Sequence, residues 1–254
     1  MVYFRPIIVF VLLSLVAACS TERAVREPRP SDAPATMLWA WERNEDLRFI
    51  DPETTGVAFL AMTITLEGES VRREPRRQPL SVPDGTYLTA VIRIETVKQT
   101  ERRPALSDGQ TAEIVELARS ALERPNTRGI QIDFDAALSE RPFYRKLMKE
   151  LRSGLPAGTP LTMTALASWC VGDRWLQEMD VDEAVPMAFV MGADAERIRS
   201  FLRAKNDWTE PLCRASYGLS IDEAPLAGLK PGRRVYYFSD DSWNAGDLKK
   251  LYYP

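Results

Sequence analysis

The sequence contains no histidine among its 254 residues. This absence excludes Ser-His-Asp and Cys-His catalysis, zinc sites with histidine ligands, and pH switches based on histidine. Cysteine is also scarce, at 3 residues, and a catalytic thiol would have no histidine to activate it. Any chemistry must therefore come mainly from carboxylates, Tyr, Lys, Arg, Ser or Thr.

Signatures of several common binding functions are missing as well. The chain has no P-loop, no G-x-G-x-x-G fingerprint and no loop with EF-hand spacing, so we expect neither a cofactor nor a bound metal. The 33 basic and 36 acidic residues give a formal charge of −3. Proteins that bind nucleic acid usually show a basic excess, so we expect no nucleic-acid partner.

The amino-terminal segment indicates export. The apolar run 7–18 would reach only about 18 Å as a helix, short of the roughly 30 Å of a bilayer core. It therefore predicts a signal peptide over residues 1–18. The run ends in Val-Ala-Ala-Cys, which resembles a bacterial lipobox and implies lipid attachment at Cys19. An ordinary cleaved signal with a chance cysteine is the alternative.

The residues after Cys19 complete this expectation. Ser20 follows Cys19, and the resemblance to lipoproteins implies that a residue other than Asp at this position leads to delivery to the outer membrane. Residues 19–36 combine prolines and charges of both signs without apolar periodicity, and they predict a flexible tether. We therefore expect a lipid-anchored protein on the periplasmic face of the outer membrane, with a folded domain over residues 37–254.

The folded part alternates short β-branched segments with amphipathic helical patterns, which predicts a parallel sheet with crossover helices. The predicted strands are 37–41, 56–65, 87–95, 129–134, 161–167, 184–191, 214–221 and 234–238. The predicted helices are 108–123, 141–155, 173–179 and 193–204, and the segment 67–83 is expected to be a hairpin or a loop. This order favours an α/β fold, a compact (β/α)₈ TIM barrel, with a doubly wound open sheet as the alternative.

Carboxylates and tryptophans gather where the predicted strands end, which is where TIM barrels carry their active sites. Asp133 and Asp135 are two residues apart on the fourth strand, so both face the barrel mouth, unless they serve only to bind loop amides. The same position makes further residues candidates for ligand contact: Trp41, Glu42, Arg43, Glu95, Trp169, Asp222, Glu223, Asp240 and Trp243. Packing for the tryptophans, and an ion pair with one of these acids for Arg43, are the structural alternatives.

The central block resembles a family of bacterial lipoproteins of unknown function. The resemblance is carried by GIQIDFDAALSERPFYRKLMKELRSGLPAGTPLTMTALASWC, VDEAVPMAFVMG and YGLSIDEAP, and it extends over roughly residues 37–243. The family is placed among TIM barrels of the glycoside-hydrolase type. The resemblance therefore implies the barrel and an exported location, and it brings no established activity.

A wider resemblance is to chitinase-type barrels, whose fourth strand carries D-x-x-D-x-D-x-E. Asp133 and Asp135 match the second and third acids of that pattern. Ile130 replaces the first acid, and Ala137 replaces the glutamate that is the proton donor in that family. These two departures argue against substrate-assisted chitin hydrolysis.

An acidic mouth with tryptophans suits a carbohydrate, because indole faces stack on sugar rings and carboxylates bind hydroxyls or act as acid and base. We therefore expect a glycoside-hydrolase-like protein that binds or hydrolyses an envelope or extracellular polysaccharide. In a hydrolase, Asp135 is the expected proton donor and Asp133 the neighbour that sets its pKa. Asp222 or Glu223 is the expected nucleophile or base. The alternative is a non-catalytic envelope protein that binds a glycan or a protein partner.

Cys170 and Cys213 are the remaining cysteines, and the expected compartment permits a disulfide between them. The predicted strands place Cys170 near the top of the fifth strand and Cys213 near the bottom of the seventh. A disulfide requires Cα atoms within about 7 Å. A disulfide and two free thiols both stay open at this point.

Overall fold

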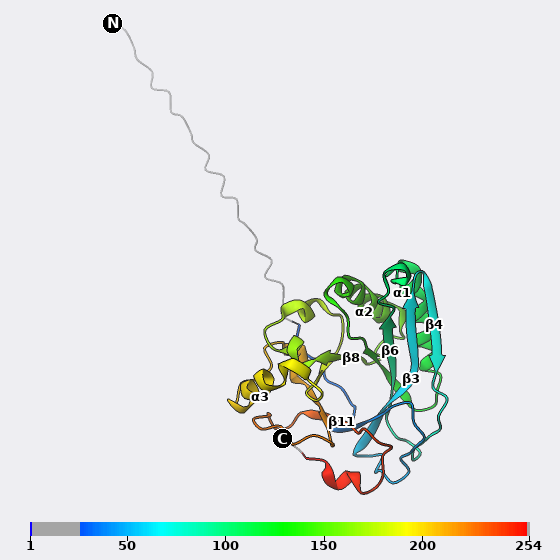
Figure 1. Cartoon of the computed structure of the whole chain (residues 1–254), viewed down its shortest axis with the longest axis vertical. Helices are drawn as coiled ribbons and strands as arrows, with labels where there is room; N and C mark the ends of the chain where they lie inside the picture. The colour runs from blue at the N-terminus through cyan, green and yellow to red at the C-terminus, as the bar shows by residue number, and fades with distance from the viewer. Residues whose placement is uncertain (2–25, 253–254) are drawn as a thin grey trace.

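The structure, a computed structural model, describes residue 1 and residues 26–252. Within this part, eight parallel strands close into a barrel, because the first strand pairs with both the second and the last (Figure 1). The barrel strands are β1 (Thr36–Ala40), β3 (Thr55–Glu67), β6 (Leu88–Thr96), β7 (Thr127–Asp133), β8 (Leu161–Leu166), β9 (Glu183–Met187), β10 (Ser216–Ser220) and β11 (Arg234–Phe238). The TIM-barrel prediction is confirmed, and the open-sheet alternative is wrong. The predicted signal peptide and Cys19 lie outside the described residues.

The segment 67–83 contains a β-hairpin instead of a crossover helix. β3 runs beyond the barrel and turns at Gly68, whose φ of 49° is a backbone conformation that glycine adopts without strain. The chain then returns as β4 (Ser70–Pro75), antiparallel to β3. A small parallel pair, β2 (Glu45–Asp46) with β5 (Leu80–Ser81), follows outside the barrel.

Three α-helices lie among the described residues: α1 (Asp108–Ala121), α2 (Arg141–Gly154) and α3 (Ala195–Arg203). α1 begins at a capping box, in which the Ser107 side chain and the Gln110 side chain each accept the other residue's backbone N–H. α1 and α2 pack against each other outside the barrel (Figure 1).

Two predicted elements are wrong in kind or extent. The helix expected over 173–179 is a short 3₁₀-helix, Arg174–Glu178, confined between a turn at Gly172 and the buried Met179. The strand expected over 184–191 ends at Met187, because the next residues form a loop in which Val190 has a φ of 47°. Further 3₁₀-helices are Thr100–Arg102, Leu138–Glu140, Ala167–Cys170, Gly192–Asp194, Pro211–Arg214 and Asp247–Lys250.

The centre of the barrel is filled by Trp39 from β1. Its indole Nε1 donates a hydrogen bond of 2.7 Å to Gln131 Oε1 on β7. The ring lies against Gly218 of β10, where an added Cβ would stand 2.7 Å from the indole. Gly218 therefore makes the space for Trp39, which closes the barrel below its carboxyl-terminal mouth.

The opposite end of the barrel is closed by a buried ion pair and by the chain that leads into β1. Arg234 binds Glu183 at 3.0 Å, and its guanidinium also donates to the carbonyls of Ala33 and Pro34. Arg29 pairs with Asp182 at 2.7 Å. The described part of the predicted tether, residues 26–35, is thus bonded to the bottom of the barrel, and Thr36 already belongs to β1.

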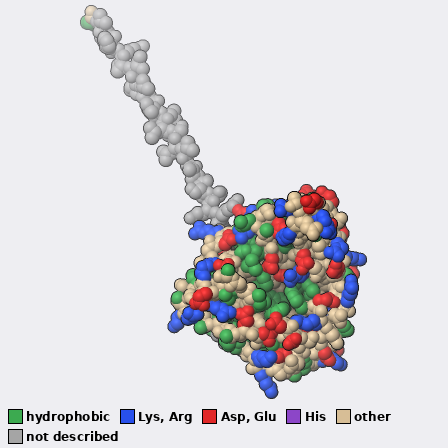
Figure 2. Space-filling model, in the orientation of Figure 1, with side chains coloured by type: hydrophobic (Ala, Val, Ile, Leu, Met, Phe, Trp, Pro, Cys, Tyr) green, Lys and Arg blue, Asp and Glu red, His purple; other side chains and the backbone are tan. Residues whose placement is uncertain are grey.

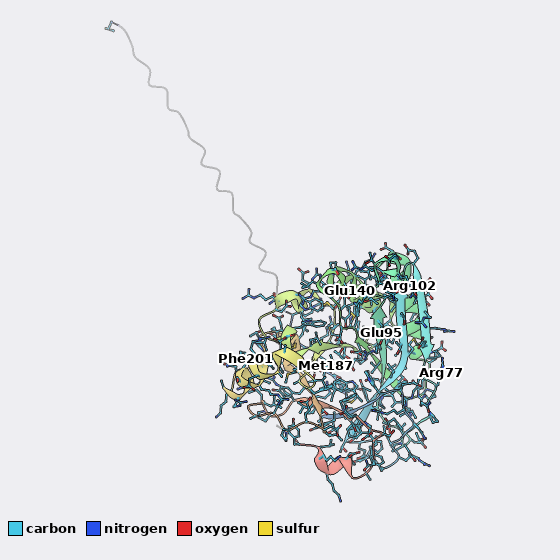
Figure 3. The ribbon with its side chains drawn as sticks, viewed as in Figure 1. Arg77, Glu95, Arg102, Glu140, Met187 and Phe201 are labelled. Atoms are coloured by element: carbon cyan, nitrogen blue, oxygen red, sulfur yellow. A yellow bond between two sulfur atoms is a disulfide. The ribbon has the colours of Figure 1, made fainter. Side chains whose placement is uncertain are left out.

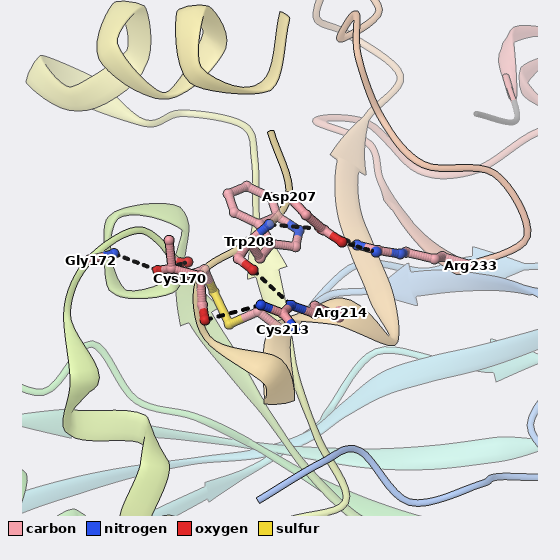
Figure 4. Close-up of a disulfide and its surroundings, with 8 residues drawn as sticks. Cys170, Gly172, Asp207, Trp208, Cys213, Arg214 and Arg233 are labelled. Carbon is pink, nitrogen blue, oxygen red and sulfur yellow. Dashed lines mark hydrogen bonds and ion pairs between the residues drawn. A yellow bond between two sulfur atoms is a disulfide. The ribbon is translucent and has the colours of Figure 1, made fainter. Parts of the chain in front are cut away.

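Cys170 and Cys213 form a disulfide with a Cα–Cα distance of 5.9 Å (Figure 4). After β8 the chain turns outward, so Ala167–Cys170 packs on the outside of β9, and Pro211–Arg214 packs on the same strand. The carbonyl of Cys170 also accepts hydrogen bonds from Thr209. The two cysteines meet beside the barrel wall, although one follows β8 and the other precedes β10.

Candidate functional site

A cavity of about 460 Å³ opens at the carboxyl-terminal ends of the strands. Trp39 lies at its base, and the lining residues come from the carboxyl-terminal halves of six strands, from the loop after β9 and from α3. It is lined by Trp39, Trp41, Arg93, Asp133, Asp135, Thr164, Leu166, Ala167, Ser168, Met187, Phe189, Val190, Met191, Asp194, Ile198, Phe238 and Asp240. Hydrophobic side chains gather near the middle of the face seen in Figure 2, among acidic and basic ones.

One side of the cavity is aromatic. Phe189 and Phe238 stack with their rings 11° from parallel and their centroids 5.2 Å apart. Trp41 meets Phe238 edge-on, with a centroid distance of 6.4 Å. These three side chains, here called the aromatic wall, offer ring faces and edges of the kind that stack on apolar ligand surfaces.

Asp133 stands on the other side, at the end of β7. Its side chain accepts a hydrogen bond of 2.7 Å from the Thr164 hydroxyl, and Arg93 Nη1 lies 3.4 Å from its second oxygen. Burial raises the pKa of Asp133, the nearby Asp135 carboxyl adds to the rise, and Thr164 and Arg93 only partly oppose it. Asp133 is therefore a buried, held carboxyl with a reduced tendency to ionise.

Asp135 follows two residues later and is exposed at the mouth. In the described part of the chain no group donates a hydrogen bond to its carboxyl, in contrast to Asp133. The surrounding protein raises the pKa of Asp135 by removing hydration, while Arg93 opposes the rise. A carboxyl that is accessible, receives no hydrogen bond and has a raised pKa is suited to donate a proton.

A second recess of about 240 Å³ adjoins the cavity on the side of β6 and β7. It shares Arg93, Asp133 and Asp135 with the cavity, and Glu95, Thr96 and Lys98 form its other polar wall. Figure 3 labels Glu95 on β6 and Met187 on β9, which line the recess and the cavity respectively. Asp135 thus stands where an aromatic space and a polar space meet.

Asp222 and Glu223 are engaged in holding loops and do not line the cavity. Asp222 Oδ2 accepts the backbone N–H of Asp240 at 2.7 Å. Glu223 accepts the backbone N–H of Val190 and a hydrogen bond from Arg199 on α3, each at 2.7 Å. The structure therefore places neither carboxylate beside Asp135, and both order the loops around the mouth.

Arg43 and Glu42 also bind backbone instead of facing the cavity. Arg43 donates to the carbonyls of Ser239, at 2.7 Å, and Asp240. Glu42 accepts the backbone N–H groups of Arg77 and Gln78 at 2.9 and 3.1 Å. The Arg43 side chain therefore contacts the backbone of the segment 239–240. Arg43 also forms an ion pair with Glu45, with Arg43 Nε and Glu45 Oε1 3.5 Å apart.

Of the tryptophans expected at the mouth, Trp41 lines the cavity, and Trp169 and Trp243 do not. Trp169 is buried against Trp175, with ring centroids 4.9 Å apart. Trp243 is buried too, and its Nε1 donates to the Trp39 carbonyl at 2.8 Å. Both indoles are packing residues, which was the structural alternative.

Glu95 and Asp240 remain accessible. Glu95 lines the polar recess and accepts a hydrogen bond of 2.9 Å from Arg93 Nε. Asp240 lines the cavity on the side of β11. The structure therefore brings Asp133, Asp135, Trp41 and Asp240 together around one cavity, and Glu95 around the adjoining recess.

Sequence reasoning missed Arg93 and the two phenylalanines of the aromatic wall. Arg93 lies two residues before Glu95 on β6, and this alternation was a usable signal that it faces the barrel interior. Phe238 ends β11 and faces inward two residues after Tyr236. Phe189 carried the same signal, because it follows Val185 and Met187 at two-residue steps within the strand expected over 184–191, and all three pack around Trp39.

Residues 26–252 contain neither a metal-binding cluster nor a membrane-spanning helix. No group of three or more Asp, Glu or Cys side chains in that part is arranged to hold a metal ion. No helix there has the length and apolar character needed to cross a bilayer.

Comparisons with known proteins concern the arrangement of elements alone. No family model and no curated protein matches the sequence. A solved structure, the spore cortex-lytic enzyme SleL of Bacillus cereus, is 16% identical with a TM-score of 0.46, over 76% of this chain and 52% of that chain. The chain thus matches about half the length of that enzyme. A likeness at this level carries no information about activity, and the resemblance to bacterial lipoproteins stays a prediction.

Proposed function

We propose that the protein binds a polysaccharide across its cavity and hydrolyses it, with Asp135 as the proton donor. The observation that carries this proposal is the state of Asp135. Its carboxyl is exposed, receives no hydrogen bond from the described residues, and has a raised pKa in a cavity whose opposite side is the aromatic wall. A glycoside hydrolase needs such a carboxyl, because the leaving oxygen of a glycosidic bond must be protonated.

The shape of the site fits a sugar chain. The aromatic wall offers ring surfaces for the apolar C–H face of one sugar. The polar recess beyond Asp135 offers the side chains of Glu95, Thr96 and Lys98 for hydroxyl groups of the next sugar. A polymer lying across both spaces would carry its glycosidic bond past Asp135.

Burial and Arg93 set the pKa of the two neighbouring carboxyls. Burial raises the pKa of both Asp133 and Asp135, and the Asp135 carboxyl adds to the rise at Asp133. Arg93 has the opposite influence on both carboxyls. Burial lowers the pKa of Arg93, but Asp133 and Glu95 outweigh it and keep the guanidinium charged. Burial and Arg93 thus act on the pKa of the proton donor from opposite directions.

The experiment is a glycan-release assay with the protein from Thr21 onward. Purified peptidoglycan, chitin and alginate are incubated with the wild type, Asp135→Asn and Asp84→Asn, and new reducing ends are counted. Asp84 is a matched control, since it is exposed on a loop and lines neither the cavity nor the recess. We expect release that falls about 100-fold or more in Asp135→Asn, as for loss of a general acid, and is unchanged in Asp84→Asn. Full activity of a folded Asp135→Asn protein would refute the assignment.

The second candidate function is glycan binding without turnover. It is favoured by Ala137, which stands where chitinase-type barrels have their proton-donating glutamate, and whose backbone N–H merely bonds to Glu140 at 2.7 Å. Saturable binding of one polymer, without release of reducing ends, would support this candidate. Loss of that binding in Trp41→Ala would place the ligand on the aromatic wall.

The cellular location belongs to the same proposal. Lipid attachment at Cys19 would hold the protein on the periplasmic face of the outer membrane, where envelope polysaccharides are within reach. The lipobox-like sequence before Cys19 supports this location.

A further inference from the structure

We propose that Asp240 is the second carboxylate of the reaction and activates the attacking water. This inference rests on the proposed hydrolysis and adds the base that the hydrolysis needs. Asp222 and Glu223 are neighbours after β10, and neither carboxylate is free. Asp222 accepts a backbone N–H of a loop, and Glu223 accepts a loop N–H and a hydrogen bond from Arg199. Besides Asp133 and Asp135, two carboxylates line the cavity, Asp194 and Asp240. Asp194 accepts hydrogen bonds from Arg197, at 3.2 and 2.8 Å, whereas Asp240 faces Asp135 from the end of β11.

The topology places Asp240 and Asp135 on facing walls. Asp240 follows β11 and Asp135 follows β7. In the closed ring of strands, β11 and β7 are separated by the same number of strands in both directions. Two side chains that enter one cavity from opposite points of a barrel must approach a bound ligand from opposite faces.

The surroundings of Asp240 hold its backbone and leave its carboxylate open. Its N–H is bound by Asp222 Oδ2 at 2.7 Å, and its carbonyl accepts from Arg43. Arg43 also binds the carbonyl of Ser239 at 2.7 Å. Among the described residues no group donates a hydrogen bond to the Asp240 carboxylate, which is exposed to the cavity. This is the arrangement expected of a base that has to be positioned and still be free to accept a proton.

A base that activates water implies a single displacement at the anomeric carbon. A water molecule on the Asp240 side attacks the anomeric carbon and transfers a proton to the Asp240 carboxylate. The glycosidic C–O bond breaks, its electron pair stays on the leaving oxygen, and that oxygen takes the proton of Asp135. The attack and the departure occur on opposite faces, so the anomeric configuration inverts. Exchange with solvent returns both carboxyls to their starting states.

The test uses the glycan that the wild type cleaves in the assay above. We expect Asp240→Asn to lower kcat about 100-fold or more, and the neighbouring Asp241→Asn to leave it unchanged. Asp241 is exposed and does not line the cavity, so it controls for loss of a nearby charge. Asp240→Ser provides a second variant if the Asn protein does not fold, as judged by its melting temperature.

Two readouts separate a base from a residue that merely shapes the loop. The acidic limb of the kcat profile should disappear in Asp240→Asn, and the basic limb should disappear in Asp135→Asn. Proton NMR of the first product should show the inverted anomer. A retained anomer, or an Asp240→Asn protein as active as Asp241→Asn, would overturn the role of Asp240 and leave Asp135 in place. Absence of wild-type turnover on every glycan would instead overturn the hydrolysis itself, and this inference with it.

Discussion

Single residues at the mouth of this barrel differ by what their carboxyl groups are bonded to. Asp133 is buried and held by Thr164 and Arg93, whereas Asp135 and Asp240 present open carboxyls to the cavity. Asp222 and Glu223 also follow a strand end in the sequence, but in the structure their carboxylates accept hydrogen bonds from loop backbone. The bonding state of each carboxylate, more than its position at a strand end, decides what chemistry it can perform.

The raised pKa of Asp133 has a consequence for stability. Because the pKa is higher in the folded than in the unfolded chain, the folded state holds this proton more tightly, and the resulting stabilisation is present below the unfolded pKa. It is lost as the pH rises through the folded pKa. We expect the free energy of unfolding of the wild type, relative to Asp133→Asn, to fall as the pH rises from about 4 upward.

Urea denaturation of both proteins across this pH range measures the difference. Asp135 is present in both proteins, so most of its own titration cancels. Parallel stability curves for the wild type and Asp133→Asn would show that Asp133 does not titrate differently on folding.

At the scale of the elements, the eight barrel strands all pair in parallel, with register shifts near Leu60 and Leu88, whereas the segments between the strands differ in kind. α1 and α2 are ordinary crossover helices, but the connection from β8 to β9 consists of two short 3₁₀-helices. These helices bury Trp169, Trp175 and Leu176 with few backbone hydrogen bonds of their own. The disulfide between Cys170 and Cys213 links this connection to the segment before β10.

Loss of that disulfide should destabilise the protein. The disulfide joins cysteines that are 43 residues apart in the sequence. Its removal should lower the free energy of unfolding by about 2–5 kcal/mol, because the unfolded chain gains conformational freedom. We expect the Cys170→Ala, Cys213→Ala double variant to melt at a lower temperature than the wild type, by calorimetry under oxidising conditions. The cavity is formed by other residues, so glycan binding at low temperature should persist. Equal melting temperatures would mean that the link adds no stability.

For the whole molecule, the barrel has a closed bottom and an open mouth. Residues 26–35 are bonded across the bottom by Arg29 and Arg234, so the described chain enters the barrel opposite the cavity. With a lipid on Cys19, this direction of entry would turn the bottom toward the membrane and the mouth toward the surrounding polymer.

The anchor itself can be tested by fractionating cells that produce the full chain. We expect the wild type in the membrane fraction and Cys19→Ala in the soluble fraction, because acyl chains on that cysteine provide the attachment. Mass spectrometry of the amino-terminal peptide should show the acyl groups. Membrane association of Cys19→Ala equal to that of the wild type would exclude lipid attachment at this residue.

The barrel could be predicted because strand patterns are local. Short β-branched runs between amphipathic helical patterns predicted the eight strands. The alternation of inward and outward side chains on β7 also places Asp133 in the interior whatever the loops do. The strand predicted over 184–191 is too long at its end, since Phe189 and Val190 look like strand residues, whereas Glu223 binds the backbone N–H of Val190 within a loop.

The sequence alone was enough for the (β/α)₈ fold, the exclusion of histidine chemistry, and the position of Asp133 and Asp135 at a strand end, because each depends on composition or on the local patterns of strands and helices. The tertiary structure decided which carboxylates stay free, which tryptophans are buried, and that Cys170 meets Cys213. These outcomes depend on contacts between residues far apart in the chain, such as Asp222 with Asp240 or Trp243 with Trp39. Loops of irregular conformation bring such residues together, and no local pattern encodes their paths.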